Sequence, residues 1–188
     1  GAIVNMGGGS KKFGIDSELL KETALKAQKL SNINLIGTHV FSATGITNEK
    51  GFLENLENSI ILAEEIKDII QIKTINFGGG IGVPYDENEN SLSIDNIFQK
   101  ILNLTDKYPF IKDNNINLIL ELGRYFVAQS GIYVTKVNYI KESRGKKFLL
   151  IDGGAHHLLR PALLNSNHPV SNLSRNSSNL EKFDIGGC

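Results

Sequence analysis

The sequence predicts an α/β fold of parallel strands and helices, followed by a smaller β domain. Short apolar segments of strand length alternate with longer segments in which apolar residues recur every three or four positions. The strand-like segments end in polar or glycine-rich loops, as is typical of parallel β/α units. After Arg124 the alternation stops, and two long strand-like segments follow. These observations indicate a β/α region that precedes a region of antiparallel strands.

Two helices and one strand are expected in the first 70 residues. Asp16 or Ser17 can cap the first helix, because short polar side chains accept hydrogen bonds from free N–H groups at a helix start. Residues 35–41 are apolar enough for a buried strand, and residues 52–70 have the pattern of an amphipathic helix. The apolar faces are formed by Leu20, Ala24, Ala27 and Leu30 in the first helix, and by Leu56, Ile60, Ala63 and Ile66 or Ile70 in the second.

The same alternation continues to residue 121. Residues 73–77 form the next expected strand, which ends in a run of glycines. Residues 94–104 carry a helical stripe that Pro109 closes off, and residues 117–121 form a third strand. Parallel strands present their carboxyl ends at one edge of a sheet. Three loops are therefore expected to share one rim, namely residues 39–44, 78–85 and 121–124.

The last third of the chain has a different pattern. Residues 131–141 and 147–152 are strand-like and are joined by the turn-like residues 142–145, which predicts a β-hairpin. We therefore expect two domains, a partial barrel over residues 1–130 and the start of a β domain over residues 131–188. Polar composition predicts loops over residues 86–93 and 165–179.

Composition excludes several classes of protein. The chain has 188 residues, of which 40% are hydrophobic and 21% are charged, so it can bury a core. Its 20 basic residues balance 20 acidic ones, which argues against a nucleic-acid or anionic-membrane partner. No apolar run approaches the roughly 20 residues of a membrane helix, and no leader is visible, so a cytoplasmic protein is expected. Cys188 is the single cysteine, which excludes an internal disulfide framework and a cysteine-rich metal site.

The predicted rim carries groups that suit one phosphorylated cofactor. Gly78, Gly79 and Gly80 leave backbone N–H groups uncovered, which suits a phosphate. Glu121 supplies a carboxylate for a pyridine nitrogen, and Arg124 supplies a guanidinium for the phosphate. These requirements are those of pyridoxal phosphate. A dinucleotide fingerprint fails because Val83 stands where it needs a glycine, and no P-loop lysine follows the glycines.

Four motifs in order resemble the fold-type III pyridoxal-phosphate decarboxylases. They are Asn76-Phe-Gly-Gly-Gly-Ile-Gly, Glu121-Leu-Gly-Arg, Asp152-Gly-Gly and Arg160-Pro-Ala-Leu. This family includes diaminopimelate, ornithine and arginine decarboxylases. The resemblance implies the C-terminal part of an alanine-racemase-like TIM (β/α)8 barrel, followed by the start of a β-sheet domain. Residues 82–85, 123–125 and 152–157 look most similar to the branch that decarboxylates an amino acid tethered to a carrier protein.

The resemblance also implies roles for single residues. Gly78, Gly79 and Gly80 match the family's phosphate loop, and Glu121 matches the carboxylate that pairs with the pyridine nitrogen. Gly123 and Arg124 match the family's phosphate-proximal pair, and Thr44 keeps a hydroxyl at the position of its phosphate-contacting serine. Substrate contacts are implied for Arg124 and Arg160, and a proton-donor role is implied for Cys188. The implied partners are an amino acid or an aminoacyl carrier protein, with a homodimer that shares its active sites.

The sequence departs from the family in three respects. Phe41 replaces a histidine that stacks on the cofactor, although an aromatic ring can still stack there. Leu164 replaces a tyrosine next to Arg160. The lysine that binds the cofactor and the first barrel strands have no counterpart in this sequence. We therefore interpret the chain as an internal piece of a longer decarboxylase. The alternatives are a non-catalytic or truncated homologue that acts as a binding partner, or a racemase of the same fold.

Simpler explanations of these residues stay open at this point. The three glycines can form a tight turn without a ligand, and Glu121 and Arg124 can form an ordinary surface ion pair. His39 is more readily explained as a core histidine than as a catalyst, and Arg160 can serve packing alone. His156 and His157 would point to opposite faces of a strand, so no metal is expected.

Overall fold

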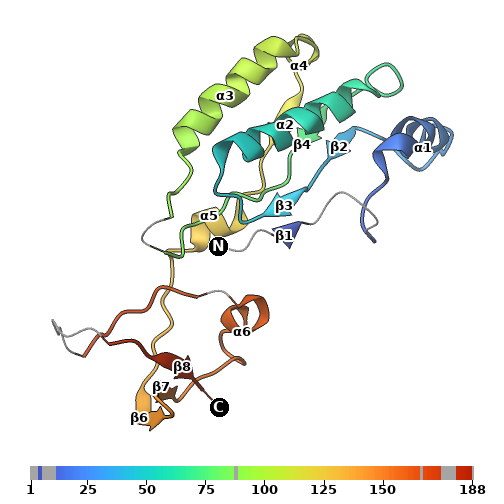
Figure 1. Ribbon diagram of the computed structural model, residues 1–188. Helices are drawn as coiled ribbons and strands as arrows, with labels where there is room; N and C mark the ends of the chain where they lie inside the picture. The colour runs from blue at the N-terminus through green and yellow to red at the C-terminus, as the bar shows by residue number, and fades with distance from the viewer. Residues whose placement is uncertain (1–3, 6–11, 87–88, 166, 175–180, 188) are drawn as a thin grey trace. The chain divides into compact units, whose positions relative to one another are not determined.

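The computed structural model describes residues 4–5, 12–86, 89–165, 167–174 and 181–187. The described residues divide into two compact units, each treated by itself below. Unit 1 comprises residues 4–84 and 89–128, and unit 2 comprises residues 85–86 and 129–187. Figure 1 shows the elements of both units in sequence colours.

A three-stranded parallel sheet forms the centre of unit 1. Its strands are β2 (Gly37–His39), β4 (Thr74–Asn76) and β5 (Asn117–Ile119), in the order β2-β4-β5. The alternation of strand and helix patterns therefore predicted the parallel arrangement correctly. Asn76 lies in register with His39 on one side and Ile119 on the other, so all three strands end at the same edge. Among the described residues the sheet is open and no closed barrel is formed.

A second, smaller sheet lies beside the strand ends. The antiparallel pair β1 (Val4–Asn5) and β3 (Ala43–Thr44) forms it, and neither strand was expected from the sequence. The segment after β3 is tied to the glycine loop, because Ile46 N–H donates to the Gly80 carbonyl at 2.8 Å and Gly82 N–H donates to the Ile46 carbonyl at 2.7 Å. These bonds place Thr44 next to the residues that follow β4.

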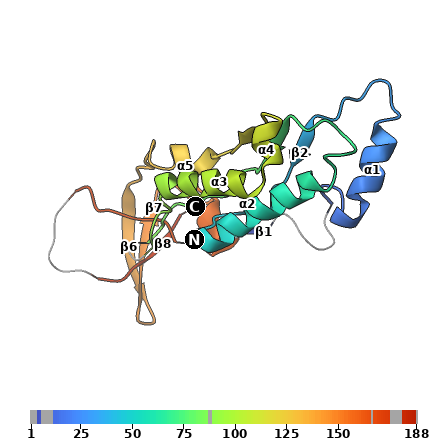
Figure 2. The ribbon, with the colours of Figure 1, turned by 90° about the horizontal axis from the view of Figure 1, so that it is seen from above.

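Two long helices, α2 (Glu49–Glu64) and α3 (Ile94–Lys107), run side by side in unit 1 (Figures 1 and 2). Each begins at a polar cap. Asn48 accepts from Gly51 N–H at 3.2 Å, and Ser93 accepts from Asn96 N–H at 3.3 Å. Helix α3 ends just before Pro109, which restricts the residue that precedes it. The helices are also joined by the ion pairs Lys100–Glu49 and Lys107–Glu57.

The core of unit 1 lies between these helices and the central strand. Phe52, Leu56 and Ile60 of α2, Ile97 of α3 and Ile75 of β4 have at most 1% of their surface exposed. Burial of each such side chain stabilises the fold by about 1.5–3 kcal/mol. The i, i+4, i+8 spacing on α2 places its three apolar side chains on one face. This packing holds the central strand, and with it the start of the glycine loop.

The helix boundaries differ from expectation at two places. Helix α2 ends at Glu64, not at residue 70, and hydrogen-bonded turns carry Ile66 and Ile70 into the core. The first helix consists of a 3-10 turn, η1 (Ser17–Leu19), and α1 (Leu20–Ala27). Asp16 precedes the turn but makes no capping hydrogen bond. Leu30 lies beyond the helix and is 53% exposed, so it does not extend the apolar face.

Two short helices follow in unit 1. Helix α4 (Phe110–Asp113) buries Phe110 and Ile111, and helix α5 (Gly123–Val127) begins directly after the loop that contains Glu121. Neither was expected, because four- and five-residue helices are too short to show a periodic apolar pattern. Helix α5 places the Gly123 and Arg124 positions at its first turn.

Unit 2 is built on the predicted hairpin. Strands β6 (Val137–Ser143) and β7 (Lys146–Ile151) are antiparallel, with a bulge between Val137 and Tyr139. Arg144 and Gly145 form the turn with φ of 53° and 78°, as the mirror-image turns of two-residue hairpins require. The hairpin is confirmed, but residues 131–136 are not strand and the turn is shorter than expected.

Two further elements of unit 2 were not expected. Strand β8 (Asp184–Gly186) pairs in parallel with β7, and helix α6 (Arg160–Leu164) begins at the Arg160-Pro motif. The parallel pairing joins residues more than 30 positions apart, so no local signal could reveal it. Within the described ranges, no helix is long and apolar enough to cross a membrane.

Candidate functional site

The glycine loop after β4 is closely surrounded by three other segments. A Cβ atom on Gly79 would lie 2.0 Å from the Glu121 carbonyl oxygen, and one on Gly80 would lie 2.3 Å from the Ala43 carbonyl oxygen. At Gly78 a Cβ would meet Phe41 Cδ2 at 2.7 Å, and the φ of 65° there also favours glycine. Close packing alone therefore requires glycine at all three positions.

The three glycines differ in what their N–H groups contact. Gly78 N–H donates to the side-chain oxygen of Asn76 at 2.9 Å. The N–H groups of Gly79 and Gly80 have no acceptor within the described ranges. Gly78 is also absent from the residues that line the adjacent pocket. Of the three expected cradle positions, Gly78 therefore already has an acceptor for its N–H group, whereas Gly79 and Gly80 have none among the described residues.

Gly79 and Gly80 line a pocket of about 360 Å³ at the carboxyl ends of the strands in unit 1. Loops after β2, β4 and β5 contribute its walls. The lining residues are His39, Phe41, Thr44, Gly79, Gly80, Ile81, Glu121, Leu122, Gly123 and Arg124. The three loops that the sequence placed on one rim therefore surround a single pocket. Parallel register produces this convergence, because all three strands end at the same edge.

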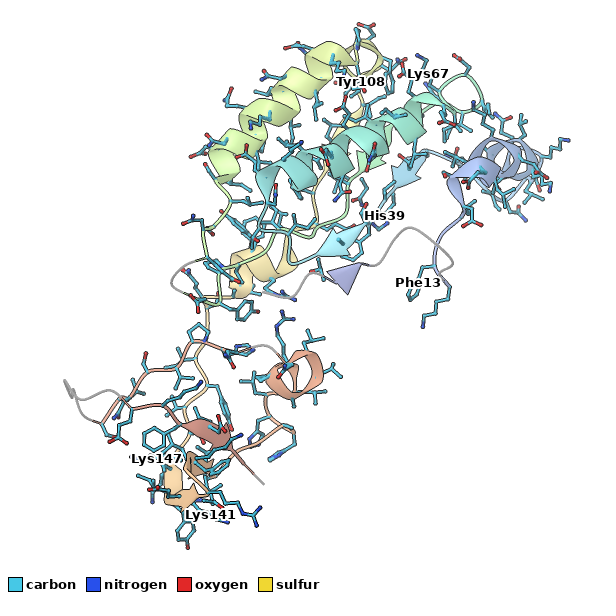
Figure 3. All side chains as sticks on the ribbon, viewed as in Figure 1. Phe13, His39, Lys67, Tyr108, Lys141 and Lys147 are labelled. Carbon is cyan, nitrogen blue, oxygen red and sulfur yellow. The ribbon has the colours of Figure 1, made fainter. Side chains whose placement is uncertain are left out.

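A second hollow of about 350 Å³ lies among residues 67–72, Phe110, Asn114 and Ile116. Residue 72 precedes β4 and Ile116 precedes β5, so this hollow is at the amino ends of the strands. It has no glycine loop and no arginine. Although the two hollows are similar in size, the chemistry of the first is far better suited to a charged ligand. In Figure 3, Lys67 of this second hollow lies near the C-terminal end of α2, whereas His39 of the first pocket lies next to β3.

Glu121 is the acidic residue in the lining of the pocket. Its Oε1 accepts from Asn76 Nδ2 at 2.8 Å, and its Oε2 lies 3.8 Å from His39 Nε2. The side chain is 53% exposed. Glu121 makes no ion pair with Arg124, which overturns the simpler explanation of these two residues as a surface pair. The carboxylate and the guanidinium are therefore both available to a ligand.

His39 is not a core residue. Its side chain is 55% exposed and lines the pocket, although β2 was expected to bury it. Among the described residues β2 is an edge strand of the sheet, and exposure rises toward its end, where His39 is its exposed last residue. The assignment of His39 to the core was wrong. The structure instead places it beside Glu121.

Phe41 and Thr44 form the remaining wall. Phe41 is 36% exposed, and its ring lies against Gly78. Thr44, the last residue of β3, is half-buried and lines the same pocket. An aromatic ring and a hydroxyl thus line the same pocket as Gly79, Gly80, Glu121 and Arg124.

Unit 2 contains Arg160, which does not line the pocket of unit 1. Its guanidinium lies 5.0 Å from the ring centroid of Tyr85, and Tyr85 contacts His168 edge-on at 4.9 Å. Nε and Nη2 of Arg160 are buried without a hydrogen-bond partner among the described residues. A flat guanidinium stacked on an aromatic ring keeps these donors available for an anion. Cys188 lies outside the described residues.

The histidine pair of unit 2 is arranged differently from the expectation. His156 and His157 lie in a turn, not in a strand, and their ring centroids are 4.0 Å apart. The prediction that they point to opposite faces was therefore wrong. His157 Nδ1 is 2.9 Å from the Tyr133 hydroxyl. No group of three or more His, Cys, Asp and Glu side chains suited to a metal occurs within the described ranges.

Asn76 is a site residue that the sequence analysis passed over. Its side chain connects the glycine loop to Glu121 through the two hydrogen bonds given above. A signal existed, since asparagine often bonds the backbone N–H two positions ahead and the next residues are Phe77 and Gly78. The hydrogen bond to Glu121 joins residues 45 positions apart, so no local sequence pattern could have predicted it.

The comparisons with known proteins agree with this geometry. The family model described as "Pyridoxal-dependent decarboxylase, pyridoxal binding domain" matches residues 1–128. L-glutamyl-[BtrI acyl-carrier protein] decarboxylase of Niallia circulans is 32% identical over 194 residues, covering 98% of this chain and 45% of that protein. Diaminopimelate decarboxylase of Methanocaldococcus jannaschii is 32% identical over 183 residues, covering 94% of this chain and 41% of that protein.

Solved structures show the same fold. Diaminopimelate decarboxylase of Helicobacter pylori, in complex with L-lysine, matches with a TM-score of 0.84 and 27% identity, over 98% of this chain and 44% of that one. The M. jannaschii enzyme matches with a TM-score of 0.83 and 30% identity, over 94% and 41%. The chain spans less than half the length of each of these relatives. On the match to its pyridoxal-binding domain and the identity to its members, this chain belongs to the family of fold-type III pyridoxal-phosphate-dependent decarboxylases.

Proposed function

We propose that unit 1 forms the pyridoxal-phosphate site of an amino acid decarboxylase of which this chain is a part. One observation carries the proposal. Considering only contacts among the described residues, the pocket at the strand ends combines two unpaired backbone N–H groups, an unpaired guanidinium and a carboxylate that is not neutralised by that guanidinium. A cofactor with a phosphate at one end and a basic ring nitrogen at the other requires this set of groups. The residues therefore fit the cofactor that the family implies.

The phosphate end would be held by Gly79 and Gly80 N–H, Arg124 and Thr44. Backbone N–H groups and an always-charged guanidinium are strong donors to phosphate oxygens. Gly123 adds open space, since apart from its chain neighbours and the backbone of its own helix no atom lies within 4 Å of the place its Cβ would take. That open space leaves room for a ligand next to the Arg124 backbone. Gly78 supports the loop and does not itself contact the phosphate.

The ring end would be held by Glu121 and Phe41. A carboxylate next to the ring nitrogen stabilises the proton on that nitrogen, and Phe41 offers an aromatic face for stacking. When bound, pyridoxal phosphate supplies an electron sink for the pair left behind as carbon dioxide departs. The contribution of Glu121 is to keep the ring positively charged. The contribution of Phe41 is to hold the ring plane in one orientation.

The substrate we propose is an amino acid, either free or attached to a carrier protein. Relatives of both kinds match this chain, one named for a glutamyl-carrier substrate and others for diaminopimelate. We assign Arg160 and Arg124 to substrate carboxylate binding, and Leu164 in place of a tyrosine would change the contacts beside Arg160. A proton-donor role for Cys188, a homodimer with shared sites and a domain boundary near residue 130 complete the proposal.

A non-catalytic homologue is the second candidate. It is favoured by two departures from the family pattern, Phe41 and Leu164, in positions that the resemblance links to cofactor and substrate. Such a protein would keep the fold and bind an active partner. It would either fail to bind the cofactor or bind it without releasing carbon dioxide.

The test uses the full-length product of the gene that encodes this chain. We expect added pyridoxal phosphate to give the absorbance band of a lysine-bound cofactor, and borohydride to trap that lysine outside these 188 residues. Glu121→Ala is expected to abolish carbon dioxide release from the amino acid substrate while leaving the circular dichroism spectrum unchanged. Glu142→Ala, which removes an exposed carboxylate in unit 2, is the matched control. Absence of the band would favour the non-catalytic homologue.

A further inference from the structure

We propose that Asn76 is a positioning residue that fixes the Glu121 carboxylate relative to the glycine loop, committing one carboxylate oxygen to the protein and leaving the other for the cofactor ring. This inference rests on the proposed function of unit 1. It concerns a side chain that would touch neither phosphate nor ring. Asn76 would act through Glu121.

The two hydrogen bonds of the Asn76 side chain define the arrangement. Oδ1 accepts from Gly78 N–H at 2.9 Å, and Nδ2 donates to Glu121 Oε1 at 2.8 Å. Asn76 is the last residue of β4, the central strand, whose preceding residue Ile75 is fully buried. The side chain therefore projects from the most firmly held strand of unit 1.

The chemistry of the two partners determines how the amide is oriented. A backbone N–H can only donate, so the side-chain atom that faces Gly78 must be the amide oxygen. The NH2 group then necessarily faces Glu121, whose ionised carboxylate only accepts. An aspartate at this position would satisfy Gly78 but not Glu121. Asparagine thus serves both partners at neutral pH, which aspartate does not.

The bond to Asn76 makes the two oxygens of Glu121 unequal. Oε1 is engaged at 2.8 Å, whereas Oε2 lies 3.8 Å from His39 Nε2, which is beyond hydrogen-bond distance. Oε2 therefore keeps a lone pair for a donor in the pocket. Because Glu121 is 53% exposed, the bond from Asn76 is what restricts its rotation. A fixed carboxylate needs no ordering when the cofactor enters.

The backbone around the site does not depend on Asn76. Glu121 N–H donates to the Gly78 carbonyl at 2.7 Å, and Phe77 N–H donates to the Ile119 carbonyl at 3.0 Å. These bonds join the two loops independently of any side chain. Substitution of Asn76 should consequently release the carboxylate without separating the loops. Among side chains, the amide of Asn76 thus connects the glycine loop, at the proposed phosphate end, to Glu121, at the proposed ring end.

The first experiment compares cofactor affinity in variants of the full-length protein. Asn76→Asp keeps the acceptor for Gly78 but opposes Glu121 with a second carboxylate, so we expect the Kd for pyridoxal phosphate at neutral pH to rise about tenfold or more. Protonation of the introduced carboxyl restores a donor, so this weakening should lessen as the pH is lowered. Asn117→Asp, at the amino end of β5, makes the same charge change on an exposed residue and should leave the Kd unchanged.

The second experiment needs no cofactor. In the apoprotein, Asn76→Asp should lower the urea midpoint of unfolding, and adding Glu121→Gln should restore it, because the new amide can donate to the introduced carboxylate. The double variant should still bind pyridoxal phosphate weakly, since the ring nitrogen has lost its carboxylate. Recovery would show that position 76 acts through its contact with position 121, whereas an Asn76 that acts through other contacts would show no recovery. We expect the double variant to fold even where the single one does not.

The outcomes separate the two proposals. Wild-type binding together with an Asn76→Asp protein of unchanged affinity and midpoint would overturn the role of Asn76 and leave the proposed function intact. Failure of the wild-type protein to bind pyridoxal phosphate would overturn both. Recovery of the midpoint in the double variant, with affinity lost in both Asn76→Asp proteins, is the result expected.

Discussion

Units 1 and 2 are stabilised in different ways. The buried apolar side chains of the described residues, from Ala24 to Leu122, all belong to unit 1. In unit 2 the described apolar side chains are at best half-buried, and Tyr139 and Ile140 of the hairpin are 72% and 69% exposed. Hydrogen bonds hold unit 2 instead, among them the β6–β7 ladder and the bonds from Thr135 and Lys136 to Asp152.

This difference explains why the candidate site belongs to unit 1. Groups that bind a charged cofactor must keep fixed positions, and a packed core supplies that rigidity better than exposed hydrogen bonds. The pocket residues follow strands whose centre is fully buried Ile75. Unit 2 instead presents apolar strand surface, which is typical of a surface that other polypeptide covers. Four experiments can test or sharpen the contrast.

The largest expected effect is a core truncation in unit 1. Ile75→Ala in the 188-residue chain should lower the free energy of unfolding by about 2–5 kcal/mol, because it removes buried methyl groups and leaves a cavity. Ile140→Ala in unit 2 should change it by less than about 0.5 kcal/mol, because that side chain is mostly exposed. Urea unfolding followed by circular dichroism measures both. Equal losses would remove the contrast between the units.

The next effect compares two crowded glycines. Gly79→Ala in unit 1 would force a methyl group onto the Glu121 carbonyl oxygen, whereas Gly153→Ala in unit 2 would meet the Tyr133 hydroxyl, the end of a side chain that can rotate. We expect a loss of about 1–3 kcal/mol for Gly79→Ala and a smaller loss for Gly153→Ala. Gly123→Ala, with nothing within 4 Å, is the control. A more harmful Gly153→Ala would show that unit 2 is the more rigid.

A smaller effect concerns Asp152 in unit 2. The Thr135 hydroxyl, followed by the Lys136 N–H, lowers the pKa of Asp152 below its ordinary value of 3.8. A lowered folded pKa adds stability that is present above about pH 3.8 and lost as the pH falls through the folded value. Thr135→Val should therefore raise the pKa of Asp152, as measured by NMR titration of its carboxyl carbon. An unchanged titration would mean that the hydroxyl does not hold Asp152.

The smallest effect concerns the helix pair of unit 1. The bond from Lys107, followed by that from the Tyr108 hydroxyl, lowers the pKa of Glu57 below 4.5. Its stabilising contribution is complete above that pH and is lost on acidification through the lower folded value. Glu57→Gln should lower the urea midpoint slightly at pH 7, and this difference should shrink as the pH falls through the folded pKa of Glu57. Glu54→Gln, an exposed carboxylate on the same helix, should show no such difference.

Local patterns predicted much of unit 1. The apolar periodicity of α2 and α3, their proline and polar boundaries and the three short apolar strands are properties of adjacent residues. The order of strand and helix then favoured parallel pairing, which put three loops at one edge. Short elements such as α5 and β3 escaped notice, because two to five residues are too few to show a period.

The sequence by itself determined the parallel β/α order, the hairpin of unit 2, the glycine loop and the carboxylate and guanidinium that follow β5. The tertiary structure alone decided that Glu121 bonds Asn76 and not Arg124, that His39 is exposed and that the N–H groups of Gly79 and Gly80 find no acceptor in the described part of the chain. The physical reason is the distance along the chain over which each kind of interaction acts. Propensity and capping act within a few residues, whereas these contacts join segments about 40 positions apart and depend on strand register and on which backbone atoms meet in the packed unit.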